Sequence, residues 1–329
     1  MPIYNSGFLT DDYYNYQPPP IKGKAWRVIY SDVTDSYITH SVSVVDDNGK
    51  ILNEYSAKKV LIEAPSRDRA QYASDLICAA LCLKQGEYSI RTKVSPLDGK
   101  IDDSLMNGLD PILYTEGPVS TSNVTLACII AAKISYRKKY QYACFKHFLS
   151  HEVFSTSIRS LDPSHWWSSK YVFNSAEFHV HAAYAIVSAY SVLEELGLEI
   201  RASQNKPSKI NGEWNPDVKN ELERRLSNAG VNLSDTILWT MRDTPTKIER
   251  FRKPRISTKA PWTYFKVRDS EIEIIDAIDY VSWLRSKISA HRLSELSGSL
   301  SYYDVVNVQH LARRLMLEHL GFWKGTTIC

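Results

Sequence analysis

The sequence has little of what marks a secreted or membrane protein. Its five cysteines are an odd number and none stands in a CxxC pair, so a disulfide framework is not expected. The first twenty residues are polar and aromatic and end in three prolines, unlike the basic and then apolar pattern of a secretory signal. The longest apolar runs, such as 124–132, are too short to span a bilayer. We therefore expect a cytoplasmic protein with reduced thiols and no membrane association.

Neither positive nor negative residues are in large excess, since the formal net charge is only +3. No global basic field indicates nucleic acid, and any such surface must be local. No glycine-rich loop follows a strand to hold phosphates, and the Gly/Pro-dense segment 96–118 lacks the lysine-threonine ending of a P-loop. No Gly-x-Ser-x-Gly elbow is present. Nucleotide hydrolysis and serine-nucleophile chemistry are therefore disfavoured.

The histidines do not form a recognisable metal signature. His147 and His151 stand four residues apart, but a zinc-protease helix needs Glu directly after the first His, and position 148 is Phe. His179 and His181 are two residues apart and would lie on different faces of a helix. We therefore expect neither a metal nor another cofactor.

Length and pattern predict an α+β chain of two domains. With 329 residues, of which 43% are hydrophobic, the chain is long enough for two separate cores. Residues 1–24, rich in Tyr, Asn and Asp, are expected to form a flexible arm or a tail that packs on an edge. Residues 25–118 mix strand and helix signals and predict a sheet-plus-helix domain of sensor or regulatory type. Residues 119–329 carry mainly helix signals and predict a helical bundle.

Local signals place the main elements of the N-terminal domain. Period-two alternation predicts strands within 26–30 and 37–45, and Asp46-Asp-Asn-Gly49 predicts a hairpin turn to a partner strand. Ser66 is the expected N-cap of a helix that ends near Gly86.

In the C-terminal domain, residues 124–157 predict one long helix or two, because Arg137-Lys-Lys139 interrupts the apolar stripe. Further helices are predicted at about 175–198, from Asn215 to Gly230, at about 269–291 and at about 303–320.

Arg285 and His291, in Leu284-Arg-Ser-Lys-Ile-Ser-Ala-His291, form the leading candidate catalytic pair. A guanidinium is a permanent cation and an imidazole titrates near neutral pH, so together they can cleave RNA without a metal. Six positions rotate a side chain by about 600° on an ideal helix, which leaves the two residues roughly 120° apart. One straight helix therefore does not aim both at one phosphate, whereas a two-fold dimer axis would bring two pairs to a shared cleft.

This string, the downstream helix beginning Tyr303-Asp-Val-Val and the upstream helix ending Leu193-Glu-Glu-Leu-Gly197 resemble the HEPN superfamily of ribonucleases and RNA-binding modules. The family motif is Arg, four to six residues, then His, and the resemblance covers about residues 175–325. It implies a HEPN-like bundle that works as a homodimer with a composite site. It also implies a metal-independent endoribonuclease of toxin or host-defence (anti-phage) type, with His291 moving protons and Arg285 stabilising the phosphorane charge.

Other residues are candidates to support this pair. The residue after the motif Arg is often Asn, Asp or His in the family, and here it is Ser286. The resemblance places an acid of the upstream helix near the site, where Glu194 and Glu195 both stand. They also fit two solvated acids, and the sequence does not say which of them matters.

The segment 242–259 has the charge and aromatic content of a surface for single-stranded RNA, although a solvated loop has the same composition. The candidate RNA-binding residues are Arg242, Lys247, Arg250, Arg252, Lys253 and Arg255.

Two other function classes stay open. A non-catalytic module would keep the fold and hold RNA or a protein. His291 would then simply lie near the C-terminal carbonyls of its helix, where a cation is stabilising. A ligand-sensing regulator would bind a small-molecule or protein trigger at the N-terminal domain and transmit that event to the helices.

Overall fold

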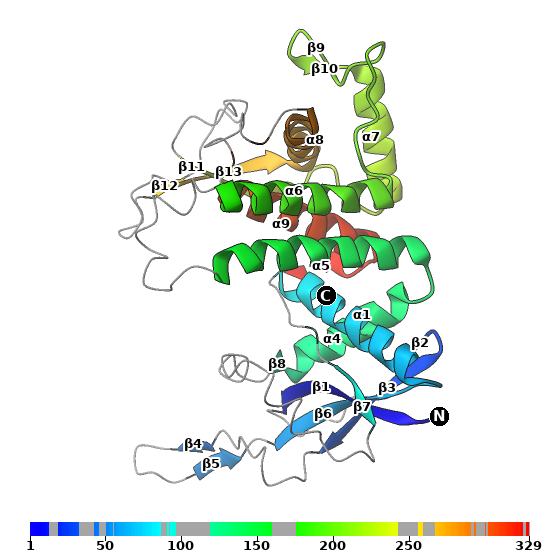
Figure 1. Cartoon of the computed structure of the whole chain (residues 1–329). Helices are drawn as coiled ribbons and strands as arrows, with labels where there is room; N and C mark the ends of the chain where they lie inside the picture. Colours follow the sequence, from blue (N-terminus) through cyan, green and yellow to red (C-terminus); the bar gives the residue numbers. More distant parts are fainter. Residues whose placement is uncertain are drawn as a thin grey trace. The chain divides into compact units, whose positions relative to one another are not determined.

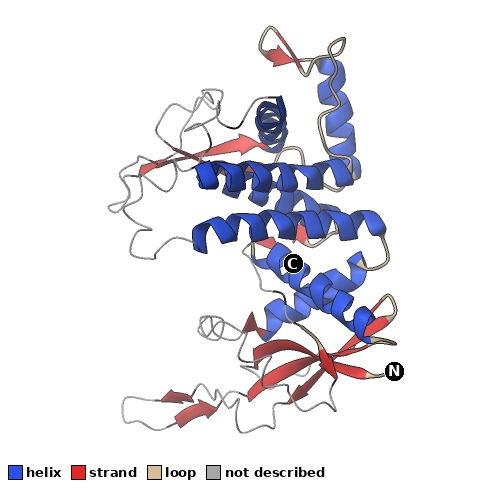
Figure 2. Ribbon diagram, viewed as in Figure 1, coloured by secondary structure: helices blue, strands red, loops and turns tan. Residues whose placement is uncertain are grey.

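The structure is a computed structural model that describes residues 1–12, 19–32, 43–45, 51–54, 56–86, 91, 93–96, 119–159, 176–242, 256–258, 267–290, 293, 300, 302–324 and 327–328. These residues form two compact units, Met1–Gln141 and Tyr142–Cys329. Both contain helices and strands, so the fold is mixed α+β, as the sequence predicts (Figures 1 and 2).

A six-stranded sheet forms the base of the first unit, in the order β2-β3-β6-β1-β7, with β8 pairing β1. All its pairings are antiparallel except that of β1 with β8. The strands are β1 (Ile3–Asp12), β2 (Ile21–Gly23), β3 (Trp26–Asp32), β6 (Ser56–Glu63), β7 (Ser95–Pro96) and β8 (Val119–Ser120). The predicted hairpin is present as β4 (Ser43–Val45) paired with β5 (Ile51–Glu54).

The expectation of a flexible arm over residues 1–24 is wrong for β1, which lies between β6 and β7 in the sheet. Its polar composition hides the strand pattern. Tyr4 and Ser6 are both buried. The Ser6 hydroxyl donates to the carbonyl of Val60 at 2.5 Å, so its polar group is satisfied in the core. A hydrogen-bonded serine can occupy a core position that a pattern of apolar residues would not assign to it.

Two helices, α1 (Arg67–Gln85) and α4 (Thr121–Ile134), complete the first unit by packing against each other and the sheet. Ser66 caps α1 by accepting from the backbone N–H of Arg69, and Gly86 ends it with φ at 80°, as predicted. The domain boundary predicted from sequence falls at residue 118, whereas the two compact units divide after Gln141. The difference arises because α4 packs on α1.

The helical segment predicted over 124–157 is two helices, since α4 ends at Ile134 and α5 (Lys138–Arg159) begins after a short turn. The basic residues Arg137, Lys138 and Lys139 stand at this break. Arg137 N–H donates to the carbonyl of Ile134 at 3.0 Å and closes the turn.

Helices form most of the second unit. They are α5, α6 (Ala176–Leu196), α7 (Pro216–Asn228), α8 (Ile274–Ala290) and α9 (Tyr302–His319). Helix α6 packs on α9 and α8, and Ser150 Oγ of α5 donates to the carbonyl of Ala185 in α6 at 2.8 Å. The small hydroxyl side chain lets these two helices approach closely, side by side in Figure 1.

A three-stranded antiparallel sheet accompanies the helices, in the order β11 (Thr236–Arg242), β13 (Val267–Glu273), β12 (Ile256–Thr258). The expected helix over 269–291 is therefore β13 followed by α8. In β13 the buried Ile272 stands between the exposed residues Glu271 and Glu273, which is the period of a strand. Two-stranded pairs β9–β10 (Lys209–Ile210, Glu213–Trp214) and β14–β15 (Trp323–Lys324, Thr327–Ile328) complete the described residues.

Candidate functional site

Helix α8 places Arg285 at the surface beside α6. The preceding residue, Leu284, is buried, and the backbone turn that buries it directs Arg285 to the edge of the helix. Its Nη2 lies 3.3 Å from Glu194 Oε1, and its guanidinium carbon lies 5.8 Å from the centre of the Tyr190 ring. With 41% of the side chain exposed, Arg285 is anchored by α6 and still open to a ligand.

The structure separates the two adjacent acids that the sequence could not rank. Glu194 faces Arg285, whereas Glu195 binds the Lys146 ammonium of α5 at 2.7 Å. Consecutive helical residues differ by about 100° around the axis, so they meet different neighbours. Glu194 therefore joins the candidate site and Glu195 does not.

Tyr190 is a residue of this site that the sequence analysis missed. It stands four positions before Glu194 on the same face of α6, and its hydroxyl lies 3.2 Å from Ser282 Oγ of α8. Burial raises the pKa of Tyr190, and the nearby Glu194 carboxylate raises it further. The phenol therefore stays protonated at neutral pH, and it braces α6 against α8 beneath Arg285. The spacing of four from Glu194 is the signal that could have found it.

Ser286 points its hydrogen bond along its own helix and not toward Arg285. Its hydroxyl donates to the carbonyl of Ser282 at 2.8 Å, and Ser289 donates to the carbonyl of Arg285 at 2.9 Å. His291 follows the last residue of α8 and lies outside the described residues.

Most of the candidate RNA-binding segment also lies outside the described residues, namely Lys247, Arg250, Arg252, Lys253 and Arg255. Arg242 is the last residue of β11 and pairs with Val267 of β13. Strand β12, which follows the segment, pairs with the same strand β13. Its role in RNA binding stays a prediction.

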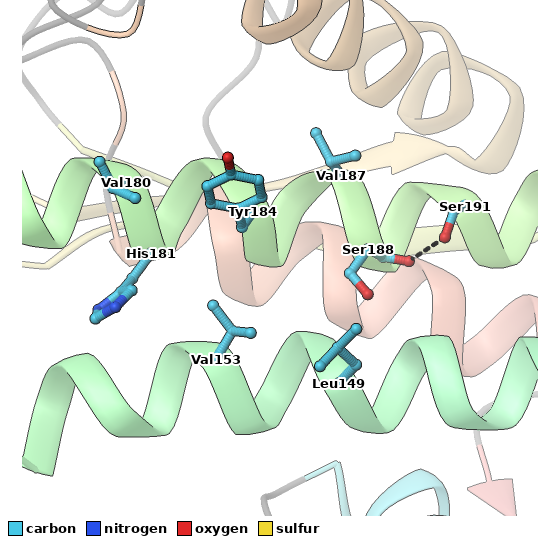
Figure 3. A pocket seen from close by; sticks show the side chains of 8 residues that line it. All are labelled: Leu149, Val153, Val180, His181, Tyr184, Val187, Ser188 and Ser191. Carbon is cyan, nitrogen blue, oxygen red and sulfur yellow. Dashed lines mark hydrogen bonds between the residues drawn. The ribbon is translucent and has the colours of Figure 1, made fainter.

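A groove of about 600 Å³ lies between α5 and α6 on the second unit (Figure 3). Its wall is mainly apolar, and three of its side chains are large and exposed: Leu149 (45%), Val180 (37%) and Tyr184 (63%). The lining is Leu149, Val153, Val180, His181, Tyr184, Val187, Ser188 and Ser191. Ser191 stands on α6 three residues before Glu194.

His147 and His151 of α5 are both buried, with ring centres 4.7 Å apart. Burial lowers the pKa of His147 well below its ordinary value and lowers that of His151 to about 4, and the positive charge of Arg313 lowers both further. Both imidazoles are therefore neutral at pH 7.

No family model, no curated protein and no solved structure matches this chain. The resemblance to the HEPN superfamily, which depends on Arg285, His291 and their flanking helices, stays a prediction. Within the described part of the chain, none of the helices has the length and hydropathy that crossing a membrane would require.

Proposed function

We propose that this protein cleaves RNA without a metal, at a site built on Arg285 and His291, and that it acts as a homodimer in the cytoplasm. The observation that carries the proposal is the setting of Arg285. It is an accessible guanidinium held at the junction of α6 and α8 by Glu194 and Tyr190. Only its Nη2 contacts the acid, and a guanidinium has five N–H donors, so donors remain for a phosphate.

The proposed reaction needs one proton-transfer group and one cation. The His291 imidazole takes the proton of a ribose 2′-hydroxyl, whose oxygen then forms a bond to the adjacent phosphorus. The bond from phosphorus to the 5′-oxygen breaks, and that oxygen takes a proton from the His291 imidazolium, which returns to its neutral form. Arg285 stabilises the negative charge on the phosphorane, because it keeps its own proton. The products are a 2′,3′-cyclic phosphate and a 5′-hydroxyl.

An ideal-helix argument and the groove support a homodimer. On an ideal helix six positions would set Arg285 and His291 roughly 120° apart, so one copy alone would aim them poorly at one phosphate. The groove between α5 and α6 offers an apolar surface on which a second copy could dock. A toxin or host-defence role, with the first unit sensing or restraining, is part of the proposal and depends on the resemblance alone.

The test is cleavage of labelled RNA in excess chelator by the wild type, Arg285→Ala, His291→Ala and the control Arg224→Ala, which alters an exposed cation of α7. We expect both site variants to lose roughly 100-fold or more in rate, since a general base and a charge-stabilising donor each contribute about that much. The control should retain full activity, and the products should carry cyclic phosphate ends.

Cleavage that survives both substitutions, or that the chelator abolishes, would contradict the proposal. One observation favours a second candidate, a non-catalytic RNA-binding or protein-binding module. The Glu194 carboxylate offsets the charge of Arg285, which weakens the attraction of that point for a phosphate. RNA that is retained but left intact under every condition tested would support this second function.

A further inference from the structure

The first unit carries a concentrated basic surface at the junction of α4 and α5. We call this set of exposed side chains the basic surface, and it consists of Lys24, Lys133, Arg137, Lys138 and Lys139, with Tyr136 beside them. The sequence contains no Asp or Glu between Glu116 and Glu152, nor between residues 19 and 31. In a chain whose net charge is only +3, such clustering marks a local site of positive potential.

Hydrogen bonds from three separate elements hold this junction in one arrangement. The buried Ser135 accepts the backbone N–H of Lys24 on its Oγ at 2.9 Å, which fixes the β2–β3 turn against the end of α4. Gln141 Nε2 donates to the Ser135 carbonyl at 2.7 Å, and Tyr72 of α1 donates to Gln141 Oε1 at 2.7 Å. The cations are therefore displayed on a rigid base.

The helix dipole does not favour the placement of the two lysines. Lys138 and Lys139 occupy the first turn of α5, where the helix dipole is positive, and no acidic residue stands in that turn. Neither lysine forms an ion pair with a carboxylate of the described residues. Positions that break a local preference are expected at functional surfaces.

Aromatic rings complete the chemistry of this surface. Tyr136 is 57% exposed, directly before Arg137. Tyr140 is buried, with the Arg137 guanidinium 5.7 Å and the Lys139 ammonium 5.3 Å from its ring centre, so these two cations are steered over one ring. An open ring beside a row of cations suits a chain of phosphates whose bases can stack.

We propose that the basic surface binds single-stranded nucleic acid, with Tyr136 stacking on a base and Arg137, Lys138 and Lys139 contacting phosphates. A membrane surface is the weaker match, because membrane-binding helices present a broad apolar face. Helix α4 instead buries most of its apolar residues, among them Val124, Ile130 and Ile134. Duplex is disfavoured too, since paired bases offer no free face to a tyrosine.

This surface lies in the first unit and Arg285 in the second, so the proposal does not depend on the catalytic one. A fluorescent oligothymidylate separates the two, because DNA lacks the 2′-hydroxyl that the proposed cleavage requires. Anisotropy with the full-length protein, repeated at several salt concentrations, reports binding alone.

The double variant Lys138→Gln/Lys139→Gln should bind about 10-fold more weakly or worse, and its salt slope should fall by about 1.4, since each phosphate contact to a single strand contributes about 0.7. The matched control Lys219→Gln/Arg224→Gln removes the same charge from α7 and should bind as the wild type does. Tyr136→Ala should lose about 5- to 150-fold through lost stacking, while Tyr136→Phe should keep its affinity.

The variant Lys138→Glu/Lys139→Glu is the control for correct folding, because it places acids where the dipole of α5 favours them. This variant should melt at the same temperature as the wild type or higher, and bind most weakly of all. Equal losses in the α7 control, a preference for duplex over single strand, or binding to anionic vesicles without binding to the oligonucleotide would each overturn the proposal.

Discussion

The choice between Glu194 and Glu195 shows what a single residue position decides. The two acids are neighbours in the chain and identical in chemistry, yet only Glu194 meets Arg285, while Glu195 meets Lys146. Sequence reasoning placed both near the candidate pair but could not separate them. The choice depends on the rotation of α6 relative to α5 and α8, which packing sets and local sequence does not encode.

The buried histidines of the second unit should make its stability depend on pH. The folded pKa of His151 is about 4, below its ordinary value of 6.5, because burial and the charge of Arg313 disfavour the imidazolium. The unfolded chain therefore binds the proton more tightly. His151 stabilises the fold fully above pH 6.5 and loses this contribution as pH falls toward 4, about 3 kcal/mol in all.

The slope of the unfolding free energy against pH reports how many protons the chain takes up on unfolding. We expect His151→Leu to reduce this number by about one between pH 6.5 and 4, measured by urea unfolding across that range. His147 and His310 keep their own dependence in the variant, since burial lowers the pKa of each of them as well. Arg224→Gln serves as the control and should leave the slope unchanged. A slope in His151→Leu equal to that of the wild type would show that its imidazole is not desolvated in the folded state.

At the scale of elements, Arg314 joins α9 to the start of β11. Its buried guanidinium binds Glu318 Oε1 at 2.9 Å, Asp235 Oδ2 at 2.7 Å and the Thr236 carbonyl at 2.6 Å. Burial raises the pKa of Glu318, and the charge of Arg314 opposes that rise. One planar side chain with five donors therefore satisfies groups from a helix, a loop and a strand.

Arg314→Ala should lower the free energy of unfolding by about 3–5 kcal/mol, because it leaves the buried Glu318 carboxylate without its cation. Arg314→Lys should recover only part of this loss, since an ammonium cannot reach all three acceptors in the same plane. Lys219→Ala, which breaks a more exposed pair with Glu223, should cost about 0.5 kcal/mol or less. Urea denaturation measures all three variants, and equal effects of Arg314→Ala and Lys219→Ala would refute this role.

Elements with strong local signals were predictable, and elements held by distant partners were not. The sequence predicts that α1 begins after Ser66 and ends at Gly86, and the structure confirms both ends, because caps act within one helical turn. In contrast, β1 and β13 depend on partners far along the chain: β1 pairs with β6, and β13 pairs with β11. Their polar residues give weak alternation, so an arm and a helix were expected in their places.

At the scale of the whole molecule, the two proposed sites lie in different units. The basic surface lies in the first unit, whereas the Arg285 guanidinium in the second unit is paired with Glu194. If both proposals hold, one unit retains the nucleic acid while the other performs chemistry on it. Such a division would also explain how a chain of low net charge attracts a polyanion, since recruitment needs only a local field.

The groove between α5 and α6 is the surface at which we expect two copies to meet. Val180, Tyr184, Val187 and Ser191 of its wall are spaced by four, three and four residues, the period that lets one helix seam meet another. A stable dimer buries about 800 Å² on each partner, so contact should extend along both helices beyond the groove itself. Placing a charge in the middle of this wall should therefore separate the copies.

We expect the wild type to elute as a dimer at micromolar concentration and Tyr184→Glu to elute as a folded monomer, measured by size-exclusion chromatography with light scattering. Ile210→Glu is the matched control, since Ile210 is an exposed apolar residue of β9 outside the groove. A monomeric wild type would contradict the homodimer. A dimeric Tyr184→Glu would move the interface away from the groove. If the monomeric variant also loses RNA cleavage while retaining oligothymidylate binding, the reaction requires two copies and the basic surface requires only one.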